Sequence, residues 1–146
     1  MSGIEISCDP TRLDLKAVHD LLKNSYWAEG MPFEVIKKAC ENSLCFGAYD
    51  GSKQVAIARV VTDRATYAYL TDVMVSDVYR GQGIGKKLME SILKHPDLQG
   101  LRRFALFTKD AHELYRKFGF KDCVKPECYL EVYEGNPYLP KAQPNR

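Results

Sequence analysis

An apolar stretch that runs directly into a glycine-rich turn constrains this chain more than any other feature. The run Val73-Met74-Val75 ends at the polar pair Ser76-Asp77, a basic turn follows over residues 80–85, and Ile84 and Leu88 begin a helical spacing. A strand that opens through glycines into a helix leaves backbone N–H groups without partners at the helix N-terminus. Together with the positive end of the helix dipole, these groups favour a phosphorylated ligand.

The glycines of this turn fit neither of two common nucleotide-binding motifs. Gly81, Gly83 and Gly85 lie at every second position, whereas a Rossmann turn needs G-x-G-x-x-G. A Walker motif would need glycine at position 80 and Ser or Thr at position 87, where the chain has Arg80 and Lys87. By themselves the glycines do not distinguish a turn that binds a ligand, called the cradle below, from a plain strand-to-helix turn. The preceding strand and Arg80 favour the cradle.

Bulk properties exclude several classes of protein. A length of 146 residues with 45% hydrophobic content is typical of one globular domain. A net charge of +2 without a long basic run gives no reason to expect nucleic acid, and no apolar run reaches the roughly 20 residues of a membrane span. The N-terminus lacks signal-peptide features, so a cytoplasmic protein is expected. The five cysteines contain no C-x-x-C pair, and neither a disulfide framework nor a metal site is expected.

Hydrophobic periodicity predicts one mixed α/β domain over residues 1–134. The expected elements are a strand over 4–7, helices over 11–24 and from Pro32 onward, strands over 44–49, 54–62 and 67–75, a helix over 83–94, a strand over 101–108, a helix after the capping-box pattern Asp110 to Glu113, and strands over 120–123 and 128–133. Gly119 is expected to end the last helix. Residues 135–146 contain three prolines and no periodicity, which predicts a loosely ordered tail.

Two motifs resemble the signatures of the GCN5-related N-acetyltransferase (GNAT) superfamily. Arg80-Gly81-Gln82-Gly83-Ile84-Gly85 matches the pattern Arg/Gln-x-x-Gly-x-Gly/Ala, and residues 111–120 resemble A-x-x-L-Y-x-K-x-G-F. One helix and one strand separate the motifs, and the whole chain resembles the small single-domain bacterial members. The resemblance implies an α/β (α+β) acyl-CoA N-acyltransferase fold. Such a fold has a mixed, mostly antiparallel sheet of six to seven strands with about four helices, splayed between the fourth and fifth strands.

The resemblance also implies acetyl-CoA as the acyl donor. Backbone N–H groups of residues 80–86 would hold the pyrophosphate, and the backbone edge of Val73 and Val75 would pair with the pantetheine arm in the gap between the strands. The cofactor-binding residues expected on this basis are Val73, Met74, Val75, Arg80, Gly81, Gln82, Gly83, Ile84, Gly85, Lys86, Thr108 and Tyr115. Thr108 departs from the family pattern, which often has Asn there, and its side chain has a shorter reach.

Tyr115 matches the family tyrosine whose hydroxyl lies near the CoA sulfur. An unperturbed phenol has a pKa of about 10 and a thiol one of about 8.5, so full proton transfer to the departing thiolate would be uphill by roughly 2 kcal/mol. We therefore expect Tyr115 to assist catalysis by a hydrogen bond. From helical spacing alone, a core tyrosine is the alternative.

The general base is the open part of this predicted site. An alkylamine with a pKa of about 10.4 is almost wholly protonated at pH 7, so a carboxylate would help to remove its proton. Many family members have Glu at the position of Tyr69, whereas the only acid on this strand is Asp72. Asp72 is either the catalytic base or a structural carboxylate. Strand alternation puts it opposite Tyr69 unless a β-bulge changes its face. Glu29 and His112 are weaker candidates.

Aromatic side chains predict the acceptor pocket, although core packing is the alternative for them. The expected substrate-binding residues are Tyr26, Trp27, Glu29 and Tyr69. Aromatic walls suit an apolar or cationic amine. The expected reaction is therefore transfer of acetyl from acetyl-CoA to a primary amine of a small molecule, or of a protein, by direct attack in a ternary complex. A non-catalytic CoA-binding regulatory module is the alternative. Polyamine, aryl-alkylamine, amino acid, antibiotic and protein lysine stay open as acceptors, and the superfamily's frequent dimers make a homodimer an open expectation.

Overall fold

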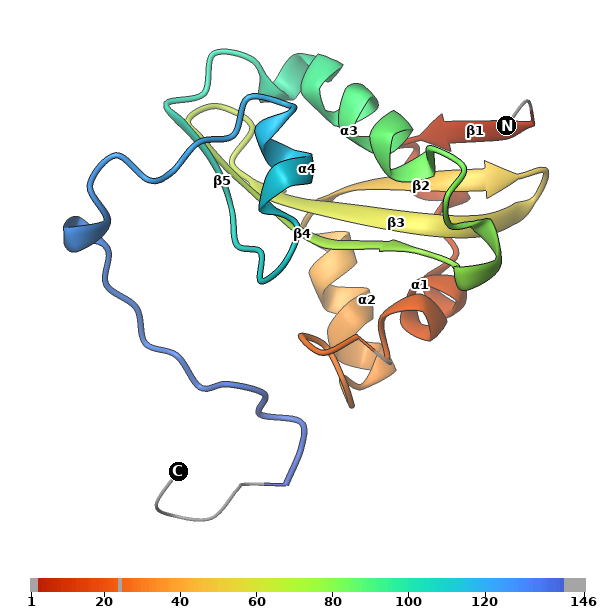
Figure 1. Cartoon of the computed structure of the whole chain (residues 1–146). Coiled ribbons are helices and arrows are strands. Elements are labelled where there is room, and N and C mark those ends of the chain that lie inside the picture. The colour runs from red at the N-terminus through yellow and green to blue at the C-terminus, as the bar shows by residue number, and fades with distance from the viewer. Residues whose placement is uncertain (1–2, 24, 141–146) are drawn as a thin grey trace.

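Five strands form one sheet in chain order. In the computed structural model, which describes residues 3–23 and 25–140, β1 (Ile4–Ser7), β2 (Leu44–Asp50), β3 (Lys53–Thr62) and β4 (Tyr67–Val75) form an antiparallel meander, and β5 (Arg103–Leu106) joins β4 in parallel (Figure 1). The predicted mixed, mostly antiparallel sheet is confirmed. The number of strands is five in the described part of the chain, and the expectation of six to seven was wrong.

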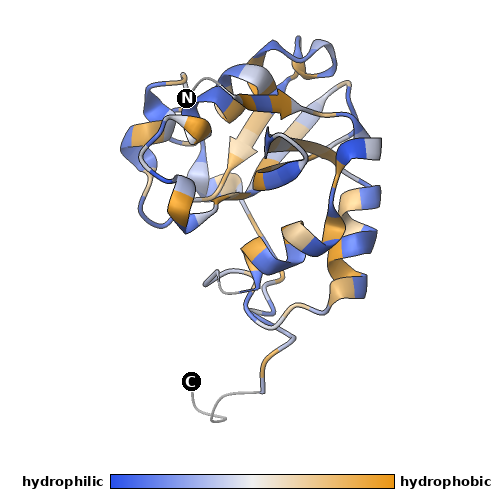
Figure 2. Ribbon diagram, turned by 90° about the vertical axis from the view of Figure 1, so that its right-hand side faces the viewer, coloured by the Kyte–Doolittle hydropathy of each residue, from blue (hydrophilic) through white to orange (hydrophobic). Residues whose placement is uncertain are grey.

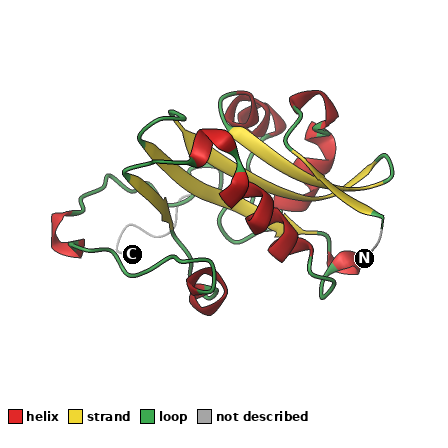
Figure 3. Ribbon diagram, turned by 90° about the horizontal axis from the view of Figure 1, so that it is seen from above, coloured by secondary structure: helices red, strands yellow, loops and turns green. Residues whose placement is uncertain are grey.

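Helices cover both faces of this sheet (Figure 3). Helices α1 (Leu15–Leu22) and α2 (Phe33–Glu41) lie on one face and α3 (Ile84–Lys94) lies on the other, while the short α4 (His112–Arg116) follows β5 (Figure 1). Along the helices, hydrophobic and hydrophilic residues alternate as expected for helices with one buried side (Figure 2). Among residues 3–23 and 25–140, no helix combines the length and the apolar character needed to cross a bilayer.

Two hydrophobic clusters hold the layers together on opposite faces of the sheet. The cluster on the α3 face contains Phe46, Leu88 and Ile92, and the cluster on the α1 and α2 face contains Leu22 and Ile57. All five side chains are at most 1% exposed. Burying a side chain of this size stabilises a fold by roughly 1.5–3 kcal/mol, so these clusters fix the position of β4 between the two helical layers.

The first predicted helix is in fact two elements with separate caps. The Asp9 carboxylate accepts a hydrogen bond from the Thr11 backbone N–H at 2.9 Å and begins a 3-10 turn over Pro10–Arg12. The Asp14 carboxylate then accepts from the Ala17 N–H at 3.1 Å and begins α1. The expected helix over 11–24 was therefore too long at its N-terminal end, because two Asx caps divide it.

The two expected C-terminal strands do not form. Residues 121–134 are all exposed and contain only a 3-10 turn, η4 (Pro126–Cys128). The alternation over 128–133 suits a strand, but a strand needs a neighbour to pair with, and no strand of residues 3–23 or 25–140 pairs with it. Farther on, the Asn136 amide donates to the Glu29 carbonyl oxygen at 2.6 Å. Of the predicted tail, residues 141–146 lie outside the described residues.

A β-bulge changes the direction of side chains in the second half of β4. Ile57 of β3 pairs with Met74, and Arg59 pairs with Thr71, so β4 has one residue more than β3 between these pairs. The extra residue coincides with Asp72, whose φ of 56° lies in the left-handed region. In consequence the Asp72 side chain lies on the same face of the sheet as that of Arg59. Simple alternation along the strand would have placed it on the opposite face.

Pairing between β4 and β5 ends well before β4 does. Residues 67–70 of β4 pair with residues 103–106, which make up the whole of β5. The remaining residues of β4, 71–75, pair only with β3 among the described strands. No described strand therefore pairs with their other edge, which leads into the turn that begins α3.

Candidate functional site

A cleft of about 760 Å³ opens where β4 runs into α3. Its size is typical of a pocket for a small molecule or a cofactor. The walls come from the α1–α2 loop, the end of β4, the glycine turn and the β5–α4 connection. The lining residues are Ser25, Tyr26, Trp27, Val73, Met74, Val75, Tyr79, Arg80, Gly81, Gly83, Ile84, Gly85 and Asp110.

The structure brings most of the predicted cofactor residues to this cleft, together with Tyr26 and Trp27 of the predicted acceptor side. Other predicted residues are not among those that line it: Gln82, Lys86, Thr108, Tyr115, Asp72, Glu29 and Tyr69. Three lining residues, Ser25, Tyr79 and Asp110, were missed. Ser25 and Tyr79 directly neighbour predicted site residues in the sequence. The capping-box pattern predicts a helix cap at Asp110, and nothing in the sequence distinguishes this role from a position on the wall of the cleft.

The glycine turn leaves open space in front of free amides. Gly81 and Gly83 have φ values of 78° and 80°, and Gly83 provides no side-chain cap for α3. The first helical bond runs from the Lys87 N–H to the Gly83 carbonyl oxygen at 3.1 Å, so the amides of 84–86 precede the helix's own bonding. A Cβ added at Gly81, Gly83 or Gly85 would have no atom of the described residues within 4 Å, apart from its neighbours in the chain and in the helix backbone. The space at the start of α3 is therefore free for a group from outside the chain.

Arg80 lies folded against the end of β4. Its Nε donates to the Val75 carbonyl oxygen at 3.2 Å, and its guanidinium forms an ion pair with Asp77 at 3.2 Å. Next to it, Gln82 Oε1 is buried, and among the described residues it is the only buried side-chain oxygen or nitrogen without a hydrogen-bond partner. A buried polar atom that lacks a partner in this way is uncommon.

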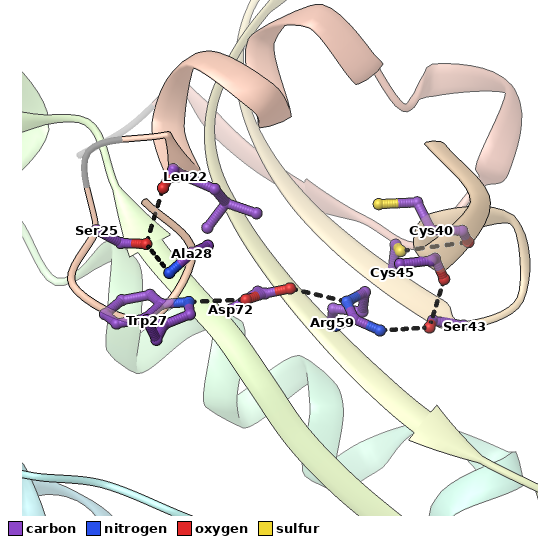
Figure 4. A network of polar contacts seen from close by, with 10 residues as sticks. Leu22, Ser25, Trp27, Ala28, Cys40, Ser43, Cys45, Arg59 and Asp72 are labelled. Atoms are coloured by element: carbon purple, nitrogen blue, oxygen red, sulfur yellow. Dashed lines mark hydrogen bonds and ion pairs between the residues drawn. The ribbon is translucent and has the colours of Figure 1, made fainter. Parts of the chain in front are cut away.

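The α1–α2 loop forms the opposite wall and is held by its own hydrogen bonds. The Ser25 hydroxyl donates to the Leu22 carbonyl oxygen at 2.8 Å and accepts from the Ala28 N–H at 3.1 Å (Figure 4). The Tyr26 and Trp27 rings meet edge to face, with their centroids 4.9 Å apart. Both rings are partly exposed and line the cleft. The loop therefore presents a pair of fixed aromatic rings to a ligand.

Asp72 connects this loop to the sheet. Its carboxylate is 7% exposed, Oδ1 accepts from Trp27 Nε1 at 2.7 Å, and Oδ2 accepts from Arg59 Nε at 2.8 Å (Figure 4). Arg59 Nη1 donates in turn to the Ser43 hydroxyl at 3.0 Å. A buried carboxylate needs such partners, because burying a charge without one costs several kcal/mol of folding free energy, on the order of 3–5 kcal/mol. Of the two roles that the sequence left open for Asp72, these contacts are typical of a structural carboxylate. A role as catalytic base stays a prediction.

Tyr115 is a mostly buried residue at the edge of the α3-side cluster. Its ring meets Phe120 edge to face at 6.1 Å, and burial raises the pKa of its hydroxyl, with smaller contributions from Asp110 and Tyr26. Asp110 and Tyr26 both line the cleft, whereas Tyr115 is not among the lining residues. A raised pKa keeps this phenol neutral at physiological pH and makes it a hydrogen-bond donor.

The β5–α4 connection closes the rim of the cleft. The Lys109 ammonium lies 5.2 Å from the Tyr26 ring centroid, a cation–π contact between this connection and the α1–α2 loop. The predicted capping box is wrong, because α4 has Ala111 as its N-cap without a side-chain bond. Instead the Thr108 Oγ1 accepts from the Ala111 N–H at 3.0 Å.

Comparisons with known proteins identify the family of this chain. A family model described as an acetyltransferase (GNAT) domain matches residues 41–122. A candidate acetyltransferase from Gibberella zeae is 31% identical over 141 residues, covering 80% of this chain and 78% of that protein. The crystal structure of a candidate GNAT acetyltransferase from Xanthomonas campestris pv. campestris is 43% identical with a TM-score of 0.91, covering 94% of this chain and 98% of the other.

A more limited similarity concerns an enzyme with a named acceptor. A thialysine N-epsilon-acetyltransferase from Mus musculus is 35% identical over 72 residues, which cover 46% of this chain and 42% of the mouse protein. The chain thus matches less than half of that enzyme. The matched family model, by contrast, spans more than half of this chain and includes both the glycine turn and Tyr115. The chain therefore belongs to the GNAT family of acetyltransferases.

Proposed function

We propose that this protein transfers an acetyl group from acetyl-CoA to a primary amine by direct attack in a ternary complex. The observation that carries the proposal is the open cradle at the start of α3. At glycines 81, 83 and 85 an added Cβ would have no described residue beyond the neighbouring backbone within 4 Å, and the amides nearby precede the first hydrogen bond of the helix. A diphosphate suits this position, because helix N-termini bind anions through free N–H groups and the helix dipole.

The unpaired part of β4 supports a site for the pantetheine arm. Beyond residue 70 the pairing with β5 has ended, and the bulge at Asp72 turns the strand at the same place. We infer that the two strands splay here and that the backbone of Val73 and Val75 pairs with the amide groups of the arm. Acetyl-CoA would supply the activated acetyl thioester, and the chain would position it.

Within this proposal, Tyr115 donates a hydrogen bond to the departing sulfur. Burial raises the pKa of its hydroxyl, which makes complete proton transfer less favourable than for a free phenol. The hydroxyl therefore remains protonated and acts by stabilising developing negative charge. A hydrogen bond to a charged group contributes about 1.5–3 kcal/mol.

The acceptor side combines aromatic rings with one carboxylate. Asp110 is exposed and is the only acidic residue among those that line the cleft, and the Tyr26 and Trp27 rings lie in the same wall system. We propose that Asp110 attracts the ammonium form of the acceptor and that the rings hold its carbon chain. The partial similarity to a thialysine N-epsilon-acetyltransferase supports an acceptor with a primary amine.

In this proposal Asp72 positions the acceptor wall and does not take the proton. Both of its oxygens accept charged or indole N–H groups, and it does not line the cleft. Proton removal would then fall to water near Asp110. The Asp110→Asn substitution should raise KM for cationic amines more than it lowers kcat, whereas Asp72→Asn should loosen Trp27 and change both.

Thiol release from acetyl-CoA in the presence of an amine panel tests the proposal. The panel contains a polyamine, an aryl-alkylamine, an amino acid, an aminoglycoside and a lysine peptide, and calorimetry measures acetyl-CoA binding in parallel. Release that depends on an amine supports the transferase. Binding without release by any amine favours the regulatory module, and absence of binding contradicts the cradle itself.

Two glycines provide a matched pair of variants for this assay. Gly83 has φ 80° and Gly51 has φ 62°, and an added Cβ would meet nothing within 4 Å at either position. Alanine therefore strains the backbone similarly at both, but only Gly83 lies at the start of α3. We expect Gly83→Ala to lose acetyl-CoA binding and Gly51→Ala to retain it. Equal loss in both would mean that backbone strain, and not the cradle, causes the defect.

A further inference from the structure

Two cysteines lie next to each other at the corner between α2 and β2 (Figure 4). Cys40 belongs to the last turn of α2 and is 6% exposed, and Cys45 is the second residue of β2 and is partly buried. The Cys45 thiol donates to the Cys40 carbonyl oxygen at 3.7 Å. The reaction proposed above uses neither thiol.

The two thiols differ in how readily they ionise. A hydrogen bond from the Cys45 thiol lowers the pKa of Cys40, while burial opposes this effect and the Arg59 guanidinium adds to it. The same hydrogen bond, followed by burial, raises the pKa of Cys45. A thiolate is the form of cysteine that reacts with oxidants, and a neighbouring thiol can then close a disulfide with the oxidised sulfur. Cys40 is therefore suited to react first and Cys45 to follow.

We propose that Cys40 and Cys45 are a redox-sensitive pair that hydrogen peroxide oxidises to a disulfide, and that this disulfide acts on the acceptor wall of the cleft. The Cys40 thiolate attacks one peroxide oxygen, the O–O bond breaks, and the departing hydroxide takes up a proton to give water, so that Cys40 becomes a sulfenic acid. The Cys45 sulfur then attacks the Cys40 sulfur, the S–O bond breaks, and the hydroxyl group leaves as water with the Cys45 proton. The two sulfurs lose the two electrons that the peroxide gains.

A chain of hydrogen bonds leads from this corner to the wall of the cleft (Figure 4). Ser43 lies between the two cysteines in the sequence, and its hydroxyl donates to the Ala39 carbonyl oxygen at 2.7 Å and accepts from Arg59 Nη1 at 3.0 Å. Arg59 Nε donates to Asp72, which in turn accepts from Trp27 Nε1. The corner and the Trp27 ring of the cleft therefore belong to one network.

Closing the disulfide changes this corner in two ways. The Cys45 sulfur loses the proton that it donates to the Cys40 carbonyl oxygen, and the two sulfurs approach to about 2.05 Å. Both changes act on residues 41–44, which connect the cysteines and include Ser43. Because Arg59 donates to Ser43, we expect the displacement to reach Asp72 and Trp27. On the basis of the proposed function, oxidation should then raise KM for the amine by about fivefold or more, the lower end of typical coupling between sites.

Peptide mapping after treatment with hydrogen peroxide tests the disulfide itself. Residues 39–53 form one tryptic peptide with both cysteines. In the native protein this peptide should lose the mass of two hydrogen atoms, and a dithiol should restore it. In Cys45→Ser it should gain oxygen at Cys40 and form no disulfide. Cys128→Ser is the matched control, because Cys128 is exposed, and it should leave the rate of oxidation unchanged. Thiols that stay reduced, or a native peptide that only gains oxygen, would overturn the proposal.

Tryptophan emission tests the connection to the cleft without any substrate, because Trp27 is the only tryptophan of the chain. Oxidation should shift the emission of the native protein. Ser43→Ala should still form the disulfide but lose this response, because Arg59 then has no hydroxyl to hold at that end. A disulfide without a shift in the native protein, or an equal shift in Ser43→Ala, would refute the connection.

Amine kinetics of the reduced and oxidised protein complete the test. A shifted emission with an unchanged KM would contradict the effect on the acceptor wall. The failure of the proposed function is distinguishable from these outcomes, since neither the peptide mass nor the emission needs turnover. Absence of thiol release with every amine would overturn the transferase and leave the disulfide in place.

Discussion

Replacing Gly85 with alanine should move stability and ligand binding in opposite directions. Gly85 is the second residue of α3, has no positive φ, and has nothing within 4 Å of an added Cβ. Glycine inside a helix is less favourable than alanine by roughly 0.5–1 kcal/mol, and less so at the helix end. We therefore expect Gly85→Ala to gain about 0.5 kcal/mol of stability. For a chain of this size, that gain raises Tm by about 1–2 °C.

The same methyl group should interfere with acetyl-CoA. It would occupy the space in front of the first-turn amides, where the proposed diphosphate lies. Loss of one charge-assisted hydrogen bond costs about 1.5–3 kcal/mol, which corresponds to a roughly ten- to hundredfold weaker affinity. The Gly81→Ala variant differs in one respect, because Gly81 has a φ of 78° that alanine adopts only with strain. It should lose both stability and affinity.

Thermal unfolding with and without acetyl-CoA measures both effects in one experiment. The native protein should gain Tm on adding acetyl-CoA, because a ligand that binds only the folded state stabilises it. Gly85→Ala should start from a higher Tm and show little gain. An unchanged ligand-induced shift in this variant would refute the assignment of the cradle, and a lower starting Tm would refute the conclusion that the space beside Gly85 is open.

Three further predictions concern the residues around the cleft and the sheet. Asp72→Ala leaves the Arg59 guanidinium without its buried partner and should lower the free energy of unfolding by about 3 kcal/mol. Urea unfolding followed by Trp27 fluorescence measures this change, and a decrease below about 1 kcal/mol would contradict the network. Tyr115→Phe should lower kcat about tenfold without changing the pH profile of kcat between pH 7 and 9, because burial raises the pKa of this hydroxyl. If a basic limb of that profile disappears in the variant, the hydroxyl transfers its proton. The Thr66 hydroxyl and nearby backbone N–H groups hold the pKa of Asp63 below its usual value. The ionised Asp63 carboxylate therefore stabilises the fold above about pH 4, and this stabilisation is lost as the pH falls further. The Tm difference between the native protein and Asp63→Ala should accordingly shrink from about pH 5 to about pH 2.

Local patterns in the sequence determined much of this protein. The glycine turn, the strand over 67–75 and the helix that starts beside Ile84 could all be predicted, because each depends on side-chain period or on residues that permit a special φ within a few positions. Because the end of β4 and the glycine turn are adjacent in the sequence, they also lie together in one wall of the cleft. Family membership followed from two such motifs in the correct order.

Tertiary structure alone decided which face Asp72 occupies and what closes the cleft. A bulge exists only relative to the partner strand, and the extra residue in β4 becomes apparent from its register with Arg59 and Ile57 of β3. Asp110 reaches the cleft because the chain folds the β5–α4 connection toward Tyr26, far away in the sequence. For residues 128–133 the sequence pattern specifies a strand, but strand pairing needs the backbone groups of a neighbour, and no local pattern states where that neighbour is.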